Sequence, residues 1–261
     1  MGGFDFNERL GLVEVKQVIW KALVAEVLGN FMLNYFGCMS CVAFASGTSH
    51  VVIALTFGLA IMAIVQSVGH VSGAHVNPAV TCAMLATGNI TIIKGILYIV
   101  AQCVGAIAGS AFLKALTPDI LQGNLGTTML GKQVQPLQGF GIEFMLGFVL
   151  VIVVFGVCDA NRPEGKGFAP LVIGLAIALG HLSSLNYTGS SMNPARSLGS
   201  AVISGIWNDH WVYWLGPILG GMCAGLLYKF VLSAAPVESR TEYSPVQLKR
   251  LDNKKEEDGL P

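Results

Sequence analysis

The sequence SGAHVNPAVT at residues 72–81 returns in similar form as TGSSMNPARS at residues 188–197. Both copies contain the tripeptide Asn-Pro-Ala, and the second copy begins 116 positions after the first. The same spacing carries GLAI at residues 58–61 onto GLAI at residues 174–177. One spacing therefore relates a helical segment, a glycine-containing loop and a tripeptide, which indicates an internal repeat. Interrupted hydrophobic segments that occur in pairs point to the central site of a membrane protein.

The composition is that of a membrane protein. Apolar residues make up 53% of the chain and charged residues only 11%, whereas soluble domains carry about 25% charged residues. The 32 glycines suit close packing of helices in lipid. The formal net charge of zero gives no reason to expect a nucleic-acid partner. Six cysteines lack metal-ligand spacing, so we expect no metal site, no disulfide framework and no cofactor.

We predict six membrane-spanning helices, because a helix needs about 20 apolar residues to cross a bilayer. They cover residues 19–43, 50–70, 93–115, 139–158, 168–186 and 211–233. Two apolar stretches, Pro78–Gly88 and Pro194–Gly205, are too short to cross. Each has proline at its start and glycine at its end, which predicts a short helix that enters the membrane and returns.

The expected fold class is an all-α membrane protein of two inverted three-helix halves. Repeat one covers about residues 19–116 and repeat two about 139–233. Together they form one channel domain over residues 1–234, followed by a polar tail at 235–261. Twelve lysines and arginines fall on the side of both termini, and only Lys114 and Lys132 on the other. The positive-inside rule then predicts cytoplasmic termini, and we expect a multi-pass protein of the plasma membrane.

The two tripeptides are the first candidate site, and they comprise Asn77, Pro78, Ala79, Asn193, Pro194 and Ala195. Each asparagine stands at an N-cap position, where it satisfies main-chain N–H groups. Each helix N-terminus also carries about half a positive charge. Capping alone would explain one asparagine. Two caps brought to one point by an inverted repeat favour a pore, in which the amides donate to a passing molecule.

Two polar residues break the symmetry of the repeat. Arg196 replaces its repeat counterpart Val80, and His181 replaces Val65. An ionisable residue at membrane depth is a functional hypothesis by default. An arginine reaching the interface and a histidine bonded to a nearby carbonyl are the simpler alternatives. Because both additions belong to the same half, we interpret them as walls of one constriction.

Two carboxylates occupy nearly equivalent positions, Glu26 and Glu143. A buried carboxylate must be paired or hydrogen-bonded. We expect structural roles, with main-chain N–H groups of the re-entrant loops as partners. A proton relay is the functional alternative.

These residues resemble the aquaporin (major intrinsic protein) family over nearly all of residues 20–233. The resemblance implies a filter at Phe57, His181, Ser190 and Arg196. Phenylalanine with histidine is similar to the water-selective branch, whereas glycerol channels have a small residue at the histidine position and aspartate where Ser197 stands. Many water channels have cysteine at position 190; the serine here leaves urea and peroxide permeation open. The stretch at residues 29–31 resembles insect channels of the PRIP type. The family usually forms homotetramers.

The expected function is a passive water channel that excludes protons and ions, and not an enzyme. Two other classes are weighed against it. An intramembrane hydrolase would use Ser190 or Ser191 as nucleophile and His181 as base, but it would leave Asn77 without a role. A structural junction protein that conducts little is not distinguished by the sequence.

Overall fold

The computed structural model describes residues 10, 19–42 and 49–235, and within these residues the chain forms helices and no strands. The long helices are α2 (Ile19–Met39), α3 (His50–Ser72), α5 (Ile92–Leu116), α6 (Pro136–Cys158), α8 (Ala169–Thr188) and α10 (Val212–Leu227), the last continued by a π-helical turn, η3 (Tyr228–Leu232). The short ones are α4 (Pro78–Ala86), η2 (Asp119–Leu121), α7 (Pro163–Lys166) and α9 (Pro194–Ser204).

The six long helices are each apolar and long enough to cross a membrane, as predicted. The first helix is shorter than predicted: it ends at Met39, and the chain leaves it in a turn over residues 40–42. Residue 43, the predicted end, lies outside the described residues. Both short helices begin at the predicted prolines and end before Thr87 and Gly205. The predicted tail lies outside the described residues from 236 onward.

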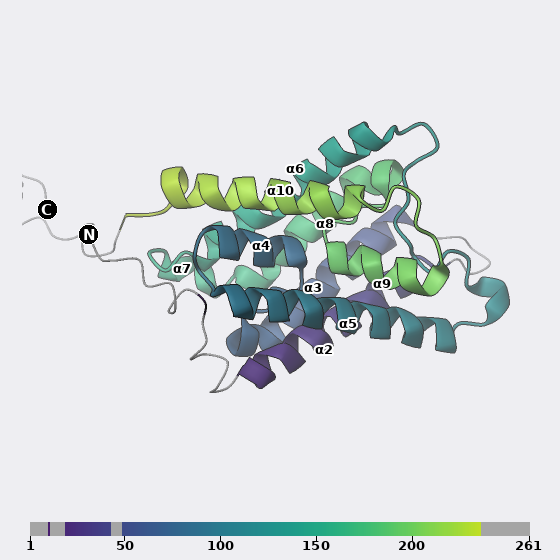
Figure 1. The fold of residues 1–261 in the computed structure, drawn as a ribbon, viewed down its shortest axis with the longest axis horizontal. Coiled ribbons are helices and arrows are strands. Elements are labelled where there is room, and N and C mark those ends of the chain that lie inside the picture. Colours follow the sequence, from purple (N-terminus) through teal and green to yellow (C-terminus); the bar gives the residue numbers. More distant parts are fainter. Residues whose placement is uncertain (1–9, 11–18, 43–48, 236–261) are drawn as a thin grey trace, which may run out of the picture.

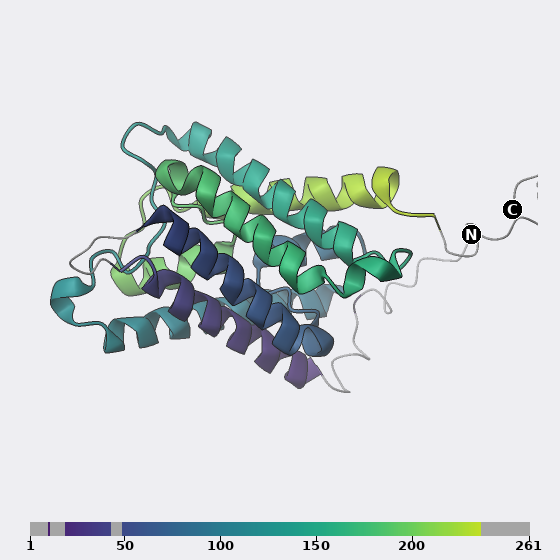
Figure 2. The same cartoon turned by 180° about the vertical axis from the view of Figure 1, so that it is seen from behind.

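The two halves have the same internal arrangement. In the first half α2 packs on α5 and α5 on α4; in the second α6 packs on α10 and α10 on α9. Helices α3 and α8 join the halves, and each half-helix also packs on a long helix of the other half, α4 on α10 and α9 on α5. Figure 1 shows α4 and α9 in opposite halves of the bundle, between α10 and α5, and Figure 2 shows α3 and α8 side by side on the other face.

Glycines bring the paired helices into contact. A side chain at Gly105 or Gly109 of α5 would run into the backbone of α2 at Val27 and Phe31. A side chain at Gly220 of α10 would likewise run into the backbone of α6. Close approach through small residues is the usual way helices associate in membranes. The half-helix α4 is also held from η3, because Lys229 Nζ donates to Thr87 O at the C-terminus of α4 (2.6 Å).

Candidate pore site

The two re-entrant loops have the same strained backbone. Ala74 and Val76 in the first loop have φ of 45° and 47°, and Ser190 and Met192 in the second have φ of 52° and 56°. These positions are related by the spacing of 116 residues. A positive φ costs energy for a residue with a side chain, so surrounding contacts must hold it. The repeat therefore preserves a local geometry and not only a sequence.

Glu26 holds the first loop. Its carboxylate accepts hydrogen bonds from His75 N (3.0 Å), Val76 N (2.7 Å) and Ser72 Oγ (2.7 Å). Gln102 Nε2 is a fourth donor at 2.7 Å. The carboxylate is fully buried, and four donors compensate for the loss of its hydration.

Glu143 holds the second loop in the same way. It accepts from Thr188 Oγ1 (2.6 Å), Ser191 N (2.8 Å) and Met192 N (2.9 Å). The main-chain N–H partners expected for both carboxylates are thus present in the structure. The second set lacks a counterpart of Gln102, so Glu143 has three donors where Glu26 has four.

The asparagines of the two tripeptides lock the loops to each other. Asn77 Oδ1 accepts from Ala79 N (2.8 Å), while its Nδ2 donates to Met192 O (2.8 Å) in the other loop. Asn193 Nδ2 donates in return to Val76 O (2.7 Å). Each amide group has two N–H bonds. One N–H of each asparagine is therefore left for a molecule in the cavity that both asparagines line.

Thr81, one turn into α4, orients His75. Its Oγ1 donates to Asn77 O (3.0 Å), accepts from Gln102 Nε2 (2.9 Å) and lies 3.1 Å from His75 Nδ1. Because the one hydroxyl proton is directed at the Asn77 carbonyl, His75 Nδ1 is the donor. The imidazole is thereby held beside the cavity.

Ser197 takes the place of Thr81 in the second repeat. Its Oγ lies 2.6 Å from Ser191 Oγ and 2.7 Å from Thr128 Oγ1. Ser191 Oγ also lies 3.1 Å from Asn193 O. Thr128, from the segment that joins the two halves, is the second partner of Ser197 Oγ, where Gln102 is a partner of Thr81 in the first repeat.

Phe57, His181 and Arg196 meet at one end of the cavity. The Phe57 ring stacks on His181 with centroids 4.3 Å apart, and Arg196 Cζ lies 4.9 Å from the Phe57 centroid. His181 Nδ1 lies 2.9 Å from Ile177 O. A carbonyl only accepts, so Nδ1 carries the proton, and in the neutral ring Nε2 is an acceptor. His181 Nε2 and Arg196 Nε are buried and have no partner within the described residues.

The Arg196 side chain is held by neutral groups. Its Nη1 donates to Gly126 O (2.7 Å) and lies 3.3 Å from Ser200 Oγ. Only 2% of the residue is exposed, and within the described chain it forms no ion pair. An arginine reaching the membrane surface would be exposed, so that alternative does not describe Arg196. Its positive charge is left to act on the cavity.

Ser190 is also buried at this site, but it is not among the residues that line the cavity. Its main-chain N donates to Thr188 Oγ1 (3.2 Å), and its Oγ has no partner within the described residues. The structure therefore brings three of the four predicted filter residues together around the cavity, and the fourth, Ser190, directly precedes Ser191, which lines it.

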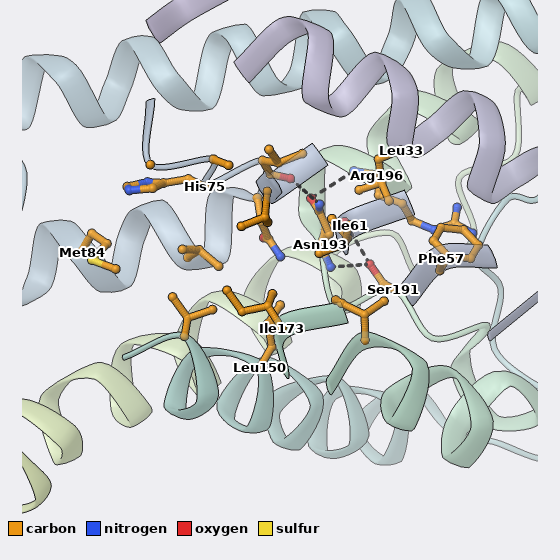
Figure 3. Close-up of a pocket in the computed structure, with 18 of the residues that line it drawn as sticks. Leu33, Phe57, Ile61, His75, Met84, Leu150, Ile173, Ser191, Asn193 and Arg196 are labelled. Atoms are coloured by element: carbon orange, nitrogen blue, oxygen red, sulfur yellow. Dashed lines mark hydrogen bonds between the residues drawn. The ribbon is translucent and has the colours of Figure 1, made fainter. Parts of the chain in front are cut away.

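The cavity has a volume of about 220 Å³ and reaches from Phe57 and Arg196 to His75 and Met84. Figure 3 shows Asn193 and Ser191 between these ends. Much of the remaining lining is apolar, from residues such as Leu33, Ile61, Leu150 and Ile173. The sequence did not indicate four residues that position this site, namely Asn34, Gly37, Gln102 and Gly126. They are not part of either motif, and their roles depend on contacts between segments that are far apart in the sequence.

Comparison with known proteins agrees with this architecture. The model of the family described as Major intrinsic protein matches residues 13–228. The chain belongs to this family, the aquaporins. Aquaporin-4 of Homo sapiens is 45% identical over 221 residues, covering 82% of this chain and 68% of that protein. Aquaporin-1 of Rattus norvegicus is 42% identical over 226 residues, covering 84% of each chain. The solved aquaglyceroporin from Plasmodium falciparum is similar in fold, with a TM-score of 0.75, 24% identity and coverage of 82% of this chain and 97% of that one.

Family membership makes this aquaporin a membrane channel for water or small solutes and not an enzyme. The hydrolase alternative is therefore excluded. The geometry agrees, because His181 Nδ1 is bonded to the carbonyl of Ile177, and Ser190 Oγ has no partner among the described residues. Ser191 Oγ is hydrogen-bonded to Asn193 O and Ser197 Oγ, so within the described residues no hydrogen bond joins either serine to His181 as a base.

Proposed function

We propose that the channel is selective for water. The observation that carries this proposal is the filter of Phe57, His181 and Arg196, in which a ring, an acceptor and a donor surround one end of the cavity. His181 Nε2 accepts a hydrogen bond from a water molecule, and Arg196 Nε donates one to it. Two buried polar atoms without protein partners are costly unless a ligand satisfies them. The stacked Phe57 ring offers no hydrogen bond and limits the space for a carbon chain.

The middle of the cavity separates water transport from proton transport. Asn77 and Asn193 each have one free amide N–H, and both donate to the oxygen of a water molecule between them. The hydrogens of that water then point toward the two ends of the cavity, which interrupts a continuous proton-conducting chain. The N-termini of α4 and α9 begin here, and their partial positive charges oppose cations.

The arrangement in the cell is a further part of the proposal. We place both termini in the cytoplasm, the filter on the outer side and the protein in the plasma membrane, as a homotetramer with one pore in each subunit. The excess of lysine and arginine on the side of the termini supports the orientation. Protease access to tags on each terminus in sealed cells tests orientation. Cross-linking in native membranes tests the tetramer.

The decisive experiment is flux through purified protein in lipid vesicles. Osmotic shrinkage gives the water permeability per channel, and the same vesicles are tested with glycerol, urea and hydrogen peroxide. We expect fast water flow and no glycerol flow above that of empty vesicles. Urea and peroxide fluxes show how far the serine at position 190 widens the filter. Glycerol flow as fast as water flow would contradict the proposal, and absence of any flow would favour a structural role.

A further inference from the structure

One face of α2 supports the filter from behind. Asn34, Gly37 and Cys38 have the spacing i, i+3, i+4 that places residues on the same side of a helix, and all three are buried. Asn34 Nδ2 donates to the main-chain O of Arg196 (3.1 Å). Cys38 Sγ lies 4.0 Å from Gly126 O, the same carbonyl that binds the Arg196 guanidinium. The outer two positions of this face therefore locate Arg196.

The middle position, Gly37, contacts the other wall of the filter. A Cβ at Gly37 would lie 2.7 Å from Phe57 Cζ and 2.8 Å from Phe57 Cδ1, well inside the 3.5–4.0 Å at which carbon atoms attract. The backbone does not require glycine here, because Gly37 is within a helix and its φ is not positive. Glycine inside a helix is less favourable than alanine, so the helix itself gives no reason for this residue. The Phe57 ring occupies the space that a side chain would need.

On its other sides the Phe57 ring faces the cavity and the two other filter residues. It is 2% exposed, stacked on His181 at 4.3 Å and covered by Arg196 at 4.9 Å. A group added at Gly37 would therefore push the ring toward these two side chains, across the filter.

The other repeat has no such pair. The counterpart of Phe57 at the spacing of 116 is Ile173, and the counterpart of Gly37 at the spacing of 117 that relates Glu26 to Glu143 is Val154. Both of these aliphatic residues line the cavity. Of these two equivalent pairs, only the one at the filter sets a glycine against an aromatic ring.

We propose that Gly37 is a specificity-determining position, which sets the width of the filter by seating the Phe57 ring. This inference rests on the proposed function only for the identity of the conducted solute. It assigns a role in selectivity to a residue that does not itself contact the solute.

The test uses the full chain in lipid vesicles, with water permeability divided by the amount of inserted protein. Gly37→Ala should lower permeability roughly tenfold or more, because a Phe57 ring pushed across the filter raises the barrier to each passing molecule. Phe57→Leu in the same chain should restore most of the flow, because the smaller side chain leaves room for the added methyl group. The single variant Phe57→Leu completes the double-mutant cycle. Gly141→Ala is the matched control, since a Cβ at this helical glycine meets nothing within 4 Å, and it should conduct as the unmodified channel does.

Two results would overturn the inference: unchanged flow in Gly37→Ala, or a loss that Phe57→Leu does not relieve at equal insertion. If Gly37→Ala fails to fold, we examine the double variant with Phe57→Leu. Folding of the double variant supports the contact between Gly37 and the Phe57 ring, and failure to fold rejects the inference. The solute carried by the unmodified channel tests the proposed function separately. If the unmodified channel carries glycerol, the permeability of each variant relative to the unmodified channel is measured with glycerol instead of water.

Discussion

Arg196 is a buried cation whose partners are all uncharged. Gly126 O and Ser200 Oγ bind its guanidinium, and neither cancels its charge. At about 4 Å and an effective dielectric constant of about 20, the repulsion of a second cation is about 4 kcal/mol, or roughly a thousandfold in rate. The charge at this residue is thus large enough to decide whether ions pass.

We expect Arg196→Val to increase proton and cation leak while water still flows. Valine is the residue at the equivalent position of the first repeat, Val80, so the half-helix backbone should tolerate it. The increase should remain partial, because the N-termini of α4 and α9 still oppose cations. Proton current at a fixed pH gradient measures the leak, with Arg162→Val, an exposed arginine, as control. A leak equal to that of the unmodified channel would make Arg196 a structural residue only.

Position 190 makes a chemical prediction about mercurials. The unmodified channel should be inhibited only weakly from the outer side, since Ser190 has no thiol and Cys38 is fully buried. Ser190→Cys should add sensitivity that a reducing agent reverses, because it places a thiol, which binds mercury as the thiolate, next to Ser191 on the cavity wall. The comparison is best made with Cys158→Ser in both proteins, since Cys158 lines the cavity. Strong inhibition without any gain from Ser190→Cys would place this side chain away from the water path.

At the residue scale, the sequence predicted which residues form the filter better than it predicted which residues hold them in place. Arg196 and His181 stood out because their repeat counterparts are valines. Nothing local indicated that Gly126, 70 residues away from Arg196, would hold the guanidinium. A carbonyl acceptor can come from any residue, so no residue type marks it in the sequence.

At the scale of elements, the half-helices were predictable because their ends carry proline and glycine at the positions where these residues favour helix boundaries. The backbone of the loops that precede the half-helices was harder to predict. The positive φ at Val76 and Met192 belongs to residues that rarely adopt it. It is imposed by Glu26 and Glu143 from neighbouring helices, which the sequence indicated only as carboxylates in need of a partner.

We therefore expect Glu143→Gln to loosen the second loop. An amide has one acceptor oxygen and one donor group, so an N–H of the side chain would face an N–H of Ser191 or Met192. An unsatisfied buried donor costs about 1–3 kcal/mol. Water flow and the melting temperature in detergent should both fall. Glu164→Gln is the control, because that side chain is 63% exposed in its ion pair with Arg162, where pairs contribute little. Equal melting temperatures for the two variants would show that the clamp is not needed.

At the scale of the whole molecule, one repeated unit builds a pore with two different ends. The backbone geometry, the carboxylate clamps and the asparagine contacts are shared by both halves. The two ends differ in their side chains: Phe57, His181 and Arg196 line one end, while Ile173, Val65 and Val80 occupy the equivalent positions. The spacing of 116 residues predicted this correspondence from the sequence, whereas the packing of α3 on α8 that brings Phe57 to His181 required the structure.

This asymmetry can be removed by giving the filter the residues of its own counterpart. Phe57→Ile with His181→Val introduces only side chains that the equivalent positions already hold, so the helices should pack normally. Both changes enlarge the filter, and the change at His181 also removes the acceptor Nε2. Glycerol should then pass, and water should continue to flow. Ions should stay excluded, because Arg196 and the half-helix ends are unchanged. Glycerol uptake by vesicles and proton current on the same preparation measure the two effects. Val65→Ile, a small change at the equivalent position of the other end, is the control and should not admit glycerol. If the double variant inserts normally and stays closed to glycerol, then the width of the channel is set elsewhere, and the assignment of Phe57 and His181 to the filter is wrong.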